Sequence, residues 1–465
     1  MGVDLITRIL FSAVLALATV VAPLPSAAAP QKGISLIRDA EAENDIRAMA
    51  TPIWQAAGLD PSSVRIHLIK DDTLNAFVAG GLRLFLNTGL IARTDHPGQL
   101  IGVIAHETGH IQGGHLARLD EALRNATAEM ILMTILAGAA AAGAGSGEAA
   151  MGAMLLPQHI AERILLSFNR GQESAADQAA VTLLDATHQS SKGLLEFFDI
   201  LGDQELLVTA RQDPYVRTHP LTRERVSFLT HHVEGSRYSN ATYPPEMVEM
   251  HRRVRAKLIA FIKAPSLTLQ RYRADDRSLE ARYARAIAFY RIPDLAQALP
   301  LIDGLIAERP RDPYFHELKG QMLFENQRPA EALAPYRKSV EYLPSSALLR
   351  VSLAQVQIEL AQRPKEPNAK TLLKEAIANL DIAMREERDN GFAWNLMAVA
   401  YGAMGDEGMA SLAMAEKALL KEKIPEARFH AGRAEKLLRR GTPAWLQAVD
   451  VLERAAAVKD EKKYR

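Results

Sequence analysis

The sequence predicts a mostly helical protein with one small β-sheet, built as an α+β domain followed by an α-solenoid. Three observations predict this fold class. Two short alternating patterns lie within the first hundred residues. Long helical patterns follow them. Beyond about residue 275 a 34-residue period appears. A chain of 465 residues is also long enough for two or more domains.

The first residues are typical of a secretory signal peptide. Arg8 precedes an apolar run from Ile9 to Ala22, and prolines and small residues follow as far as Ala29. This run of 14 residues is shorter than the roughly 20 that a spanning helix needs. We therefore expect residues 1–28 to be a signal peptide that is removed, and the mature protein to be periplasmic. An uncleaved anchor is the alternative.

Composition excludes several classes of function. The 55 basic and 55 acidic residues cancel, so no long-range field would attract nucleic acid, and we expect no nucleic-acid partner. The chain has no cysteine, which excludes disulfides, thiolate metal sites and a cysteine nucleophile. A metal ion would therefore need histidine and carboxylate ligands.

The first elements after the leader form the predicted sheet. Residues Val64–Lys70 alternate apolar and polar side chains, and Leu82–Leu86 repeat the pattern after the pair Gly80-Gly81. From Thr94 onward the pattern becomes helical, with Pro97 near its start, and it is apolar on most sides. A buried helix is predicted there.

The next segment, Met130–Gly147, has 18 residues without a charge. That length raises the possibility of a membrane span, but alanine and glycine dominate its second half and gain little from lipid. We interpret residues 130–157 as a flexible flap over a cleft or as a segment in peripheral membrane contact. A true span remains the alternative.

The last part of the chain, residues 275–465, is predicted to be a tetratricopeptide-repeat domain. Its small and helix-ending residues recur at a spacing of 34: Ala286 with Gly320, Ala298 with Ala332, and Pro310 with Pro344. The tetratricopeptide spacing of large and small residues is met by Trp394, Met397, Ala398 and Tyr401. An insertion at Arg363–Asn368 breaks the phase. An ordinary helical bundle is the alternative.

The chemical signal is the H-E-x-x-H pattern on the predicted buried helix. Residues four apart share one face of a helix, so His106 and His110 can bind one ion. Glu107 lies beside them and can take a proton from a water at that ion. The pattern indicates a hydrolytic zinc site. The alternative is that the two histidines are ordinary core residues with satisfied hydrogen bonds.

A zinc site of this kind needs a third ligand. His115 is one candidate, but it lies well round the helix from the other two histidines, and we interpret it as a solvent-facing or structural residue. A better candidate is Glu173, on a second apolar helix, where Asp177 shares its face and can accept the outer N–H of a ligating imidazole. An exposed acidic pair is the alternative.

These residues, with Asn75-Ala76-Phe77 before the glycine pair and His219-Pro220 followed by Arg225, resemble the gluzincin metallopeptidases that include HtpX and the prenyl-protein proteases. An exported catalytic domain followed by tetratricopeptide repeats looks like the periplasmic branch of β-barrel assembly-enhancing proteases. The resemblance covers nearly the whole mature chain. It implies a zincin-type α+β metallopeptidase domain over residues 29–270.

The resemblance also implies roles for single residues. His106, His110 and Glu173 match the zinc ligands for one Zn²⁺ per chain, Glu107 the general base, and Asp177 the carboxylate behind a ligand. His219 matches a catalytic histidine that approaches the metal or the scissile carbonyl and can act as a latch. The substrate-holding edge strand is matched by Asn75, Ala76, Phe77, Val78 and Ala79.

The function expected from all this is a zinc-dependent endopeptidase of the cell envelope that degrades misassembled outer-membrane proteins. Its substrates would be proteins, and its repeats would bind clients or the outer-membrane assembly machinery. Two alternatives stay open. One is a chaperone or scaffold with an inactive metal site, and the other is an integral-membrane metallopeptidase.

Overall fold

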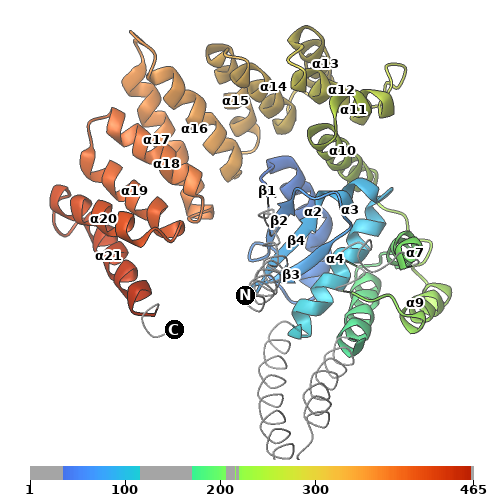
Figure 1. The fold of residues 1–465 in the computed structure, drawn as a ribbon. Coiled ribbons are helices and arrows are strands. Elements are labelled where there is room, and N and C mark those ends of the chain that lie inside the picture. The colour runs from blue at the N-terminus through green and yellow to red at the C-terminus, as the bar shows by residue number, and fades with distance from the viewer. Residues whose placement is uncertain (1–34, 116–169, 206–214, 216–218, 462–465) are drawn as a thin grey trace, which may run out of the picture. The chain divides into compact units, whose positions relative to one another are not determined.

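The computed structural model describes residues 35–115, 170–205, 215 and 219–461 (Figure 1). The predicted leader, residues 1–28, and the charge-free segment Met130–Gly147 lie outside these ranges. Within them the chain is mostly helical, with one small mixed sheet, as the sequence predicted. None of the described helices is both long and apolar enough to cross a membrane.

The sheet has four strands in the order β1-β2-β4-β3. The strands are β1 (Leu36–Ile37), β2 (Arg65–Ile69), β3 (Ala76–Ala79) and β4 (Arg83–Asn87). The two strands that the alternating patterns predicted, β2 and β4, run parallel to each other, whereas β3 pairs antiparallel with β4. Gly80 and Gly81 both have positive φ, at 54° and 88°, which lets the chain reverse between β3 and β4.

One face of the sheet packs against helices that complete the first core. These helices are α2 (Ala40–Ala56), α3 (Thr88–Arg93), α4 (Pro97–Gln112), the helix of residues 170–186, α7 (Lys192–Glu205) and α9 (Arg223–Gly235). The predicted buried helix is α4, and its first fourteen residues are all buried. It begins later than Thr94, because Thr94 ends α3 and the His96 side chain caps α4 by accepting from the Gly98 N–H.

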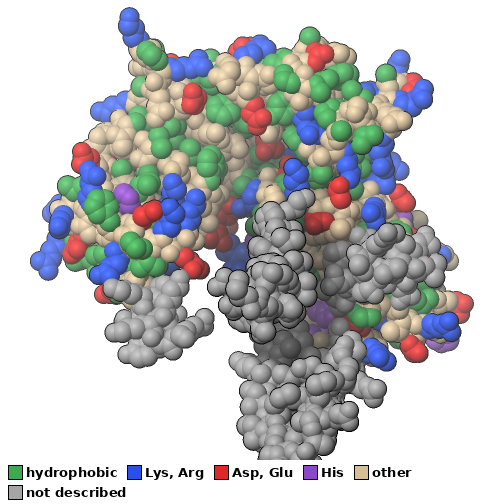
Figure 2. Space-filling model, in the orientation of Figure 1, with side chains coloured by type: hydrophobic (Ala, Val, Ile, Leu, Met, Phe, Trp, Pro, Cys, Tyr) green, Lys and Arg blue, Asp and Glu red, His purple; other side chains and the backbone are tan. Residues whose placement is uncertain are grey.

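The rest of the chain forms successive helix pairs (Figure 1). After α10 (Pro245–Ile262) and α11 (Pro265–Arg271), the helices are α12 (Leu279–Arg291), α13 (Leu295–Glu308), α14 (Pro313–Glu325), α15 (Pro329–Tyr342), α16 (Ala347–Ala361), α17 (Ala369–Glu386), α18 (Gly391–Ala403), α19 (Glu407–Leu420), α20 (Ile424–Leu437) and α21 (Pro443–Glu461). This series is a helical-repeat solenoid. Figure 2 shows acidic and basic side chains interspersed over its visible face.

The predicted repeat phase is confirmed at its small residues. The helices α12, α14 and α16 begin at residues 279, 313 and 347, each 34 residues after the last. Ala286, Gly320 and Ala354 are all buried at the same place in these helices. The phase then slips because a loop at residues 362–368 precedes the 18-residue helix α17.

Helix α10 belongs to two apolar cores. Its residues Val254 and Leu258 join the core of the sheet and its helices. Its residues Ala256 and Ala260 join a second core, which is made mostly by α12, α13 and α14. Helix α10 therefore packs against both the sheet domain and the first repeats.

A buried ionic network reinforces this junction. Glu41 on α2 is fully buried, and its carboxylate lies 2.6 Å from Arg253 Nη2 and 3.2 Å from Lys257 Nζ on α10. Tyr283 on α12 donates a hydrogen bond of 2.6 Å to Glu41 Oε2, and Arg253 pairs with Asp312 at 2.6 Å. Burial alone would raise the pKa of Glu41, but Arg253 and Lys257 hold it below its usual value. Removing one partner from such a network typically costs about 3–5 kcal/mol.

We expect Gly320→Ala to destabilise the repeats by about 1–3 kcal/mol. A Cβ atom at Gly320 would lie 2.7–2.9 Å from three atoms of the buried, rigid Tyr336 ring. The matched control is Gly304→Ala in α13, where a Cβ atom would meet nothing within 4 Å. Alanine there should stabilise the helix by about 0.5–1 kcal/mol. Urea unfolding followed by circular dichroism measures both, and equal effects of the two variants would contradict this packing.

Candidate metal centre

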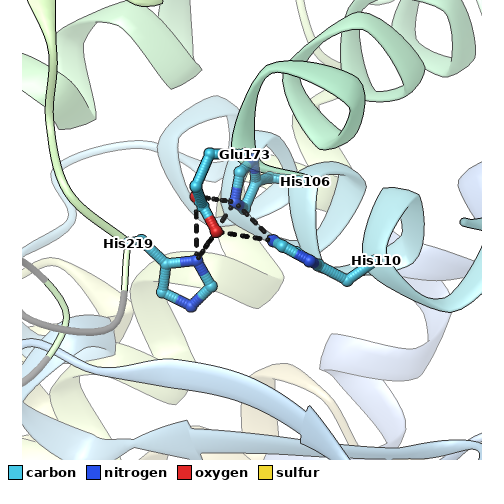
Figure 3. Close-up of side chains that lie close together, drawn as sticks. All are labelled: His106, His110, Glu173 and His219. Carbon is cyan, nitrogen blue, oxygen red and sulfur yellow. Dashed lines mark hydrogen bonds and ion pairs between the residues drawn. The ribbon is translucent and has the colours of Figure 1, made fainter. Parts of the chain in front are cut away.

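Three separate segments bring four side chains to one point (Figure 3). His106 and His110 lie one turn apart on α4, and Glu173 comes from the helix of residues 170–186. His219 comes from the segment just before α9. All four are buried, and the ligand atoms that they offer lie within 4.8 Å of one another. The structure thus brings Glu173 to the two histidines, as the proposed site requires.

Small residues let the two ligand-bearing helices approach closely. A Cβ atom on Gly109 would lie 2.7 Å from the backbone oxygen of Ala176 and 3.0 Å from its Cα. Gly109 lies between the two histidines in position on α4, and Ala176 lies between Glu173 and Asp177. Because no side chain separates the helices here, a short glutamate side chain can reach both imidazoles.

The spacing of the donor atoms fits a tetrahedral ion. Nε2 of His106 lies 3.1 Å from Nε2 of His110, and each of these nitrogens lies 3.3 Å from an oxygen of Glu173. Ligands at the Zn–N distance of roughly 2.0–2.1 Å on a tetrahedron stand about 3.4 Å apart. Two imidazole nitrogens and a carboxylate also form the donor set of catalytic zinc sites. The residues present therefore fit a zinc ion.

His219 lies at the fourth corner of this arrangement. Its Nδ1 is 3.1 Å from both oxygens of Glu173 and 3.4 Å from Nε2 of His106. Its ring stacks on the buried ring of Tyr215 at 4.5 Å, and its backbone N–H donates to the Tyr215 carbonyl. A tetrahedral ion held by the other three residues would therefore find its fourth position taken by a histidine.

A carboxylate and a guanidinium stand behind the ligands. Nδ1 of His106 lies 2.9 Å from Asp177 Oδ1. Arg225 on α9 donates to both oxygens of Asp177, at 2.6 and 2.9 Å, and lies 3.0 Å from Glu173. Arg225 also donates to the backbone oxygen of Pro220, which ties the His219 segment to the same pair of carboxylates. One arginine thus offsets the charge of two buried acids.

These contacts determine the pKa values of the side chains in the cluster. Burial lowers the pKa of His106, but the carboxylates of Asp177 and Glu173 outweigh it and raise that pKa to about 9. Burial lowers the pKa of His110 to about 4. Burial would raise the pKa of Glu173, yet hydrogen bonds from the histidines hold it far below its usual range. The cluster therefore keeps Glu173 ionised as a ligand.

Glu107 lies beside the cluster without a hydrogen bond to either carboxylate oxygen among the described residues. Its side chain is almost fully buried, and Oε1 lies 3.5 Å from Nε2 of His219. Burial raises the pKa of Glu107, although the nearby histidines act in the opposite direction. A buried acid without a donor costs free energy unless another group enters the site. Its position suits an acceptor for a proton from water.

Residues 38–233 match the family model described as peptidase family M48. They form an M48 domain. The family is one of metallopeptidases, which agrees with a cluster of His106, His110, Glu173 and His219 that could hold a metal ion.

Curated relatives extend the M48 similarity into the repeats. The chain is 24% identical to the β-barrel assembly-enhancing protease of Yersinia pestis over 381 residues, which cover 78% of this chain and 72% of that protein. It is 23% identical to the protein of the same name from Escherichia coli over 412 residues, 84% of this chain and 78% of the other.

Solved structures resemble this chain only loosely. A crystal structure of MamA is 18% identical, with a TM-score of 0.28, over 39% of this chain and 97% of its own. A tetratricopeptide protein of Thermus thermophilus is 15% identical, with a TM-score of 0.27, over 38% of this chain and all of its own.

The M48 domain contains two site residues to which sequence reasoning gave no role. Arg225 was noted only as part of a resemblance, and Tyr215 was missed. Tyr215 lies four residues before His219 and Arg225 lies six residues after it, and these spacings are the only local signal. Of the two interpretations of His115, solvent-facing or structural, the first was wrong, because its side chain is buried and its Nδ1 lies 2.9 Å from Nδ1 of His110. The chain turns back at the end of α4, which helical periodicity does not anticipate.

The proposed substrate strand, residues Asn75–Ala79, coincides with β3 and the residue before it. This strand is at the end of the sheet order, so one of its edges has no neighbour among the described strands. Ala76 and Val78 point into the core, whereas Phe77 stacks on Phe85 on the opposite face. The backbone N–H of Tyr215 donates to the Leu74 carbonyl, which places the start of this strand beside the segment that carries His219.

Proposed function

We propose that this protein is a zinc-dependent endopeptidase of the cell envelope, with His106, His110 and Glu173 as ligands. The observation that carries the proposal is the convergence of four buried donor groups within 4.8 Å, beside the Glu107 carboxylate, which accepts no hydrogen bond in the part of the chain that the structure describes. An ion there would accept the lone pairs of the two imidazole nitrogens and the Glu173 carboxylate, which otherwise face one another. It would also explain why a carboxylate that accepts no hydrogen bond from the described residues is buried next to them.

Bound zinc would supply a water of lowered pKa and polarise the substrate carbonyl. Glu107 accepts the proton of the attacking water and passes it to the leaving amine. Asp177 accepts the outer N–H of His106 and so fixes which ring nitrogen faces the ion. Residues Asn75–Ala79 hold an extended substrate by backbone hydrogen bonds along the edge of β3 that has no neighbour among the described strands, and such binding tolerates many sequences.

The setting and partners of this activity follow from the chain's own patterns and its relatives. The leader-like residues 1–28 support export to the periplasm, with peripheral membrane contact through residues 130–157. The relatives named as β-barrel assembly-enhancing proteases support a role in quality control of outer-membrane proteins. The repeats then bind client proteins or the assembly machinery, as helical solenoids commonly do.

Metal removal tests the proposal directly. The purified mature chain should contain one zinc per chain by atomic emission and should cleave casein. Dialysis against a chelator should abolish cleavage, and added zinc should restore it, because the proposed attacking water needs the ion to lower its pKa. Casein cleavage that survives complete loss of metal would contradict the proposed chemistry, and so would a native chain that binds no zinc.

His219 is proposed as a latch on the fourth position. In the His219→Ala variant we expect basal casein cleavage at saturating zinc to rise several-fold, since nothing then competes with water and substrate for that corner of the site. His231→Ala is the matched control, because His231 is exposed on α9. Unchanged basal cleavage in His219→Ala, with zinc still bound, would count against the latch.

A further inference from the structure

His115 stands where the outer nitrogen of a ligand histidine needs a partner. His106 has Asp177 behind it, but no carboxylate among the described residues lies behind His110. Instead, Nδ1 of His115 lies 2.9 Å from Nδ1 of His110, and the two rings meet edge to face at 4.9 Å. His115 is 5% exposed, so this contact is made out of water.

The backbone at the end of α4 is built for this contact. The N–H groups of Gly113 and Gly114 donate to the carbonyls of Gly109 and Ile111, which closes the helix. Gly114 has φ +60°, a left-handed conformation that reverses the chain and that glycine adopts without strain. His115 is therefore directed back toward His110 instead of onward along the helix.

The space over Gly113 is taken by the His115 ring. A Cβ atom at Gly113 would lie 2.2 Å from Nε2 of His115 and within 2.7 Å of two of its ring carbons. Yet Gly113 itself has φ −68° and ψ −12°, an ordinary helical conformation that suits alanine. Glycine at residue 113 is thus needed to leave space for the His115 ring, whereas the local backbone conformation does not require it.

The hydrogen bond between the two rings decides which nitrogen of His110 can bind metal. Nε2 of His110 faces His106 and Glu173, so the proton of the neutral ring must be on Nδ1 when Nε2 is a ligand. That N–H then donates to Nδ1 of His115, which must itself be the acceptor and carry its own proton on Nε2. A ligand whose tautomer and ring angle are held in this way binds metal more tightly.

We propose that His115 is a positioning residue for the metal site, which holds the His110 ring and its tautomer through this hydrogen bond, and that Gly113 makes room for it. The inference rests on the zinc site proposed above. The outer nitrogen of His110 would then bond to a neutral imidazole, whereas that of His106 bonds to a carboxylate. The two histidines of the H-E-x-x-H pattern are thus held in place by different groups.

Zinc affinity, measured by competition with a chromogenic chelator, tests this without reference to activity. His115→Leu should weaken zinc binding about 10-fold, the lower end of the effect of losing such a partner. His115→Asn should restore most of it, because the amide oxygen can stand where Nδ1 stood and accept the same N–H. Gly113→Ala should weaken binding as much as His115→Leu does. Thermal unfolding of each zinc-free variant shows that the fold is kept.

A double-mutant cycle makes the test specific. The effect of Gly113→Ala on zinc affinity should vanish when residue 115 is already alanine, since no ring then occupies the space. An undiminished effect in that background, or wild-type affinity in His115→Leu, would overturn the proposal while the zinc site stands. A wild-type chain that binds no zinc would overturn the site itself, and this inference with it.

Discussion

Replacing Glu107 by glutamine is expected to reduce the kcat/KM for a peptide substrate by about 10²–10⁴-fold, the range of a lost general base. The amide keeps the size of the carboxylate, and Glu107 is not among the four groups that meet at the proposed ion. Zinc content and client binding should therefore stay at the wild-type level. Single-turnover cleavage of a fluorogenic peptide, beside zinc quantification on the same sample, measures both properties.

The Glu107→Gln variant also separates the peptidase from a chaperone or scaffold. Glu234→Gln on α9 is the matched control, since Glu234 is exposed and lies outside the cluster. If Glu107→Gln retained full cleavage, proton transfer by this residue would be excluded. If the wild-type chain bound clients and zinc but neither protein cleaved anything, the repeats alone would carry the function.

The second large effect is expected at Glu173. Glu173→Gln should weaken zinc binding by more than the roughly 10–100-fold that a lost partner behind a ligand costs, because a charged ligand disappears. Its oxygens lie 3.3 Å from both imidazoles, and Arg225 lies 3.0 Å away. With an amide at residue 173, the positive charge of Arg225 would be only partly neutralised and would repel any cation that enters the site. Chelator competition should give the affinity, and activity at ordinary zinc concentrations should fall with it.

The same Glu234→Gln control serves here, because the chemical change is identical and the site is remote. Addition of high zinc should recover part of the activity of Glu173→Gln, since Glu107 and the two histidines remain. No such recovery is expected for Glu107→Gln. Wild-type zinc affinity in Glu173→Gln would remove this carboxylate from the ligand set.

The parts of the site that could be predicted from sequence are those set by helical spacing. His106, Glu107 and His110 are ordered along one helix, and Glu173 with Asp177 along another, so the period of 3.6 residues fixes which faces they share. The contacts of His115, Arg225 and Tyr215 depend on turns and packing between separate segments. No local pattern encodes that Arg225 would meet two carboxylates some fifty residues earlier in the chain.

The fold shows the same division. The repeat period was visible because every unit must bury small residues such as Gly320 against its neighbour. The order of the sheet was not visible, because β2 pairs with β4 across the intervening β3, and strand order depends on contacts between distant residues. The packing of α10 in two cores could not be predicted either, because the sequence of its apolar residues does not indicate which core each one joins.

Helix α10 makes it difficult to cut the molecule in two. A peptidase fragment that ended just after α11 would leave Ala256 and Ala260 facing solvent, and it would lose Tyr283 and Asp312 from the charges around Glu41 and Arg253. A fragment of the repeats alone would lack α10, against which α12 packs. The proposed client binding and bond cleavage would thus belong to a single folding unit, because α10 packs in the core beside the helix of His106 and His110 and in the core of the first repeats.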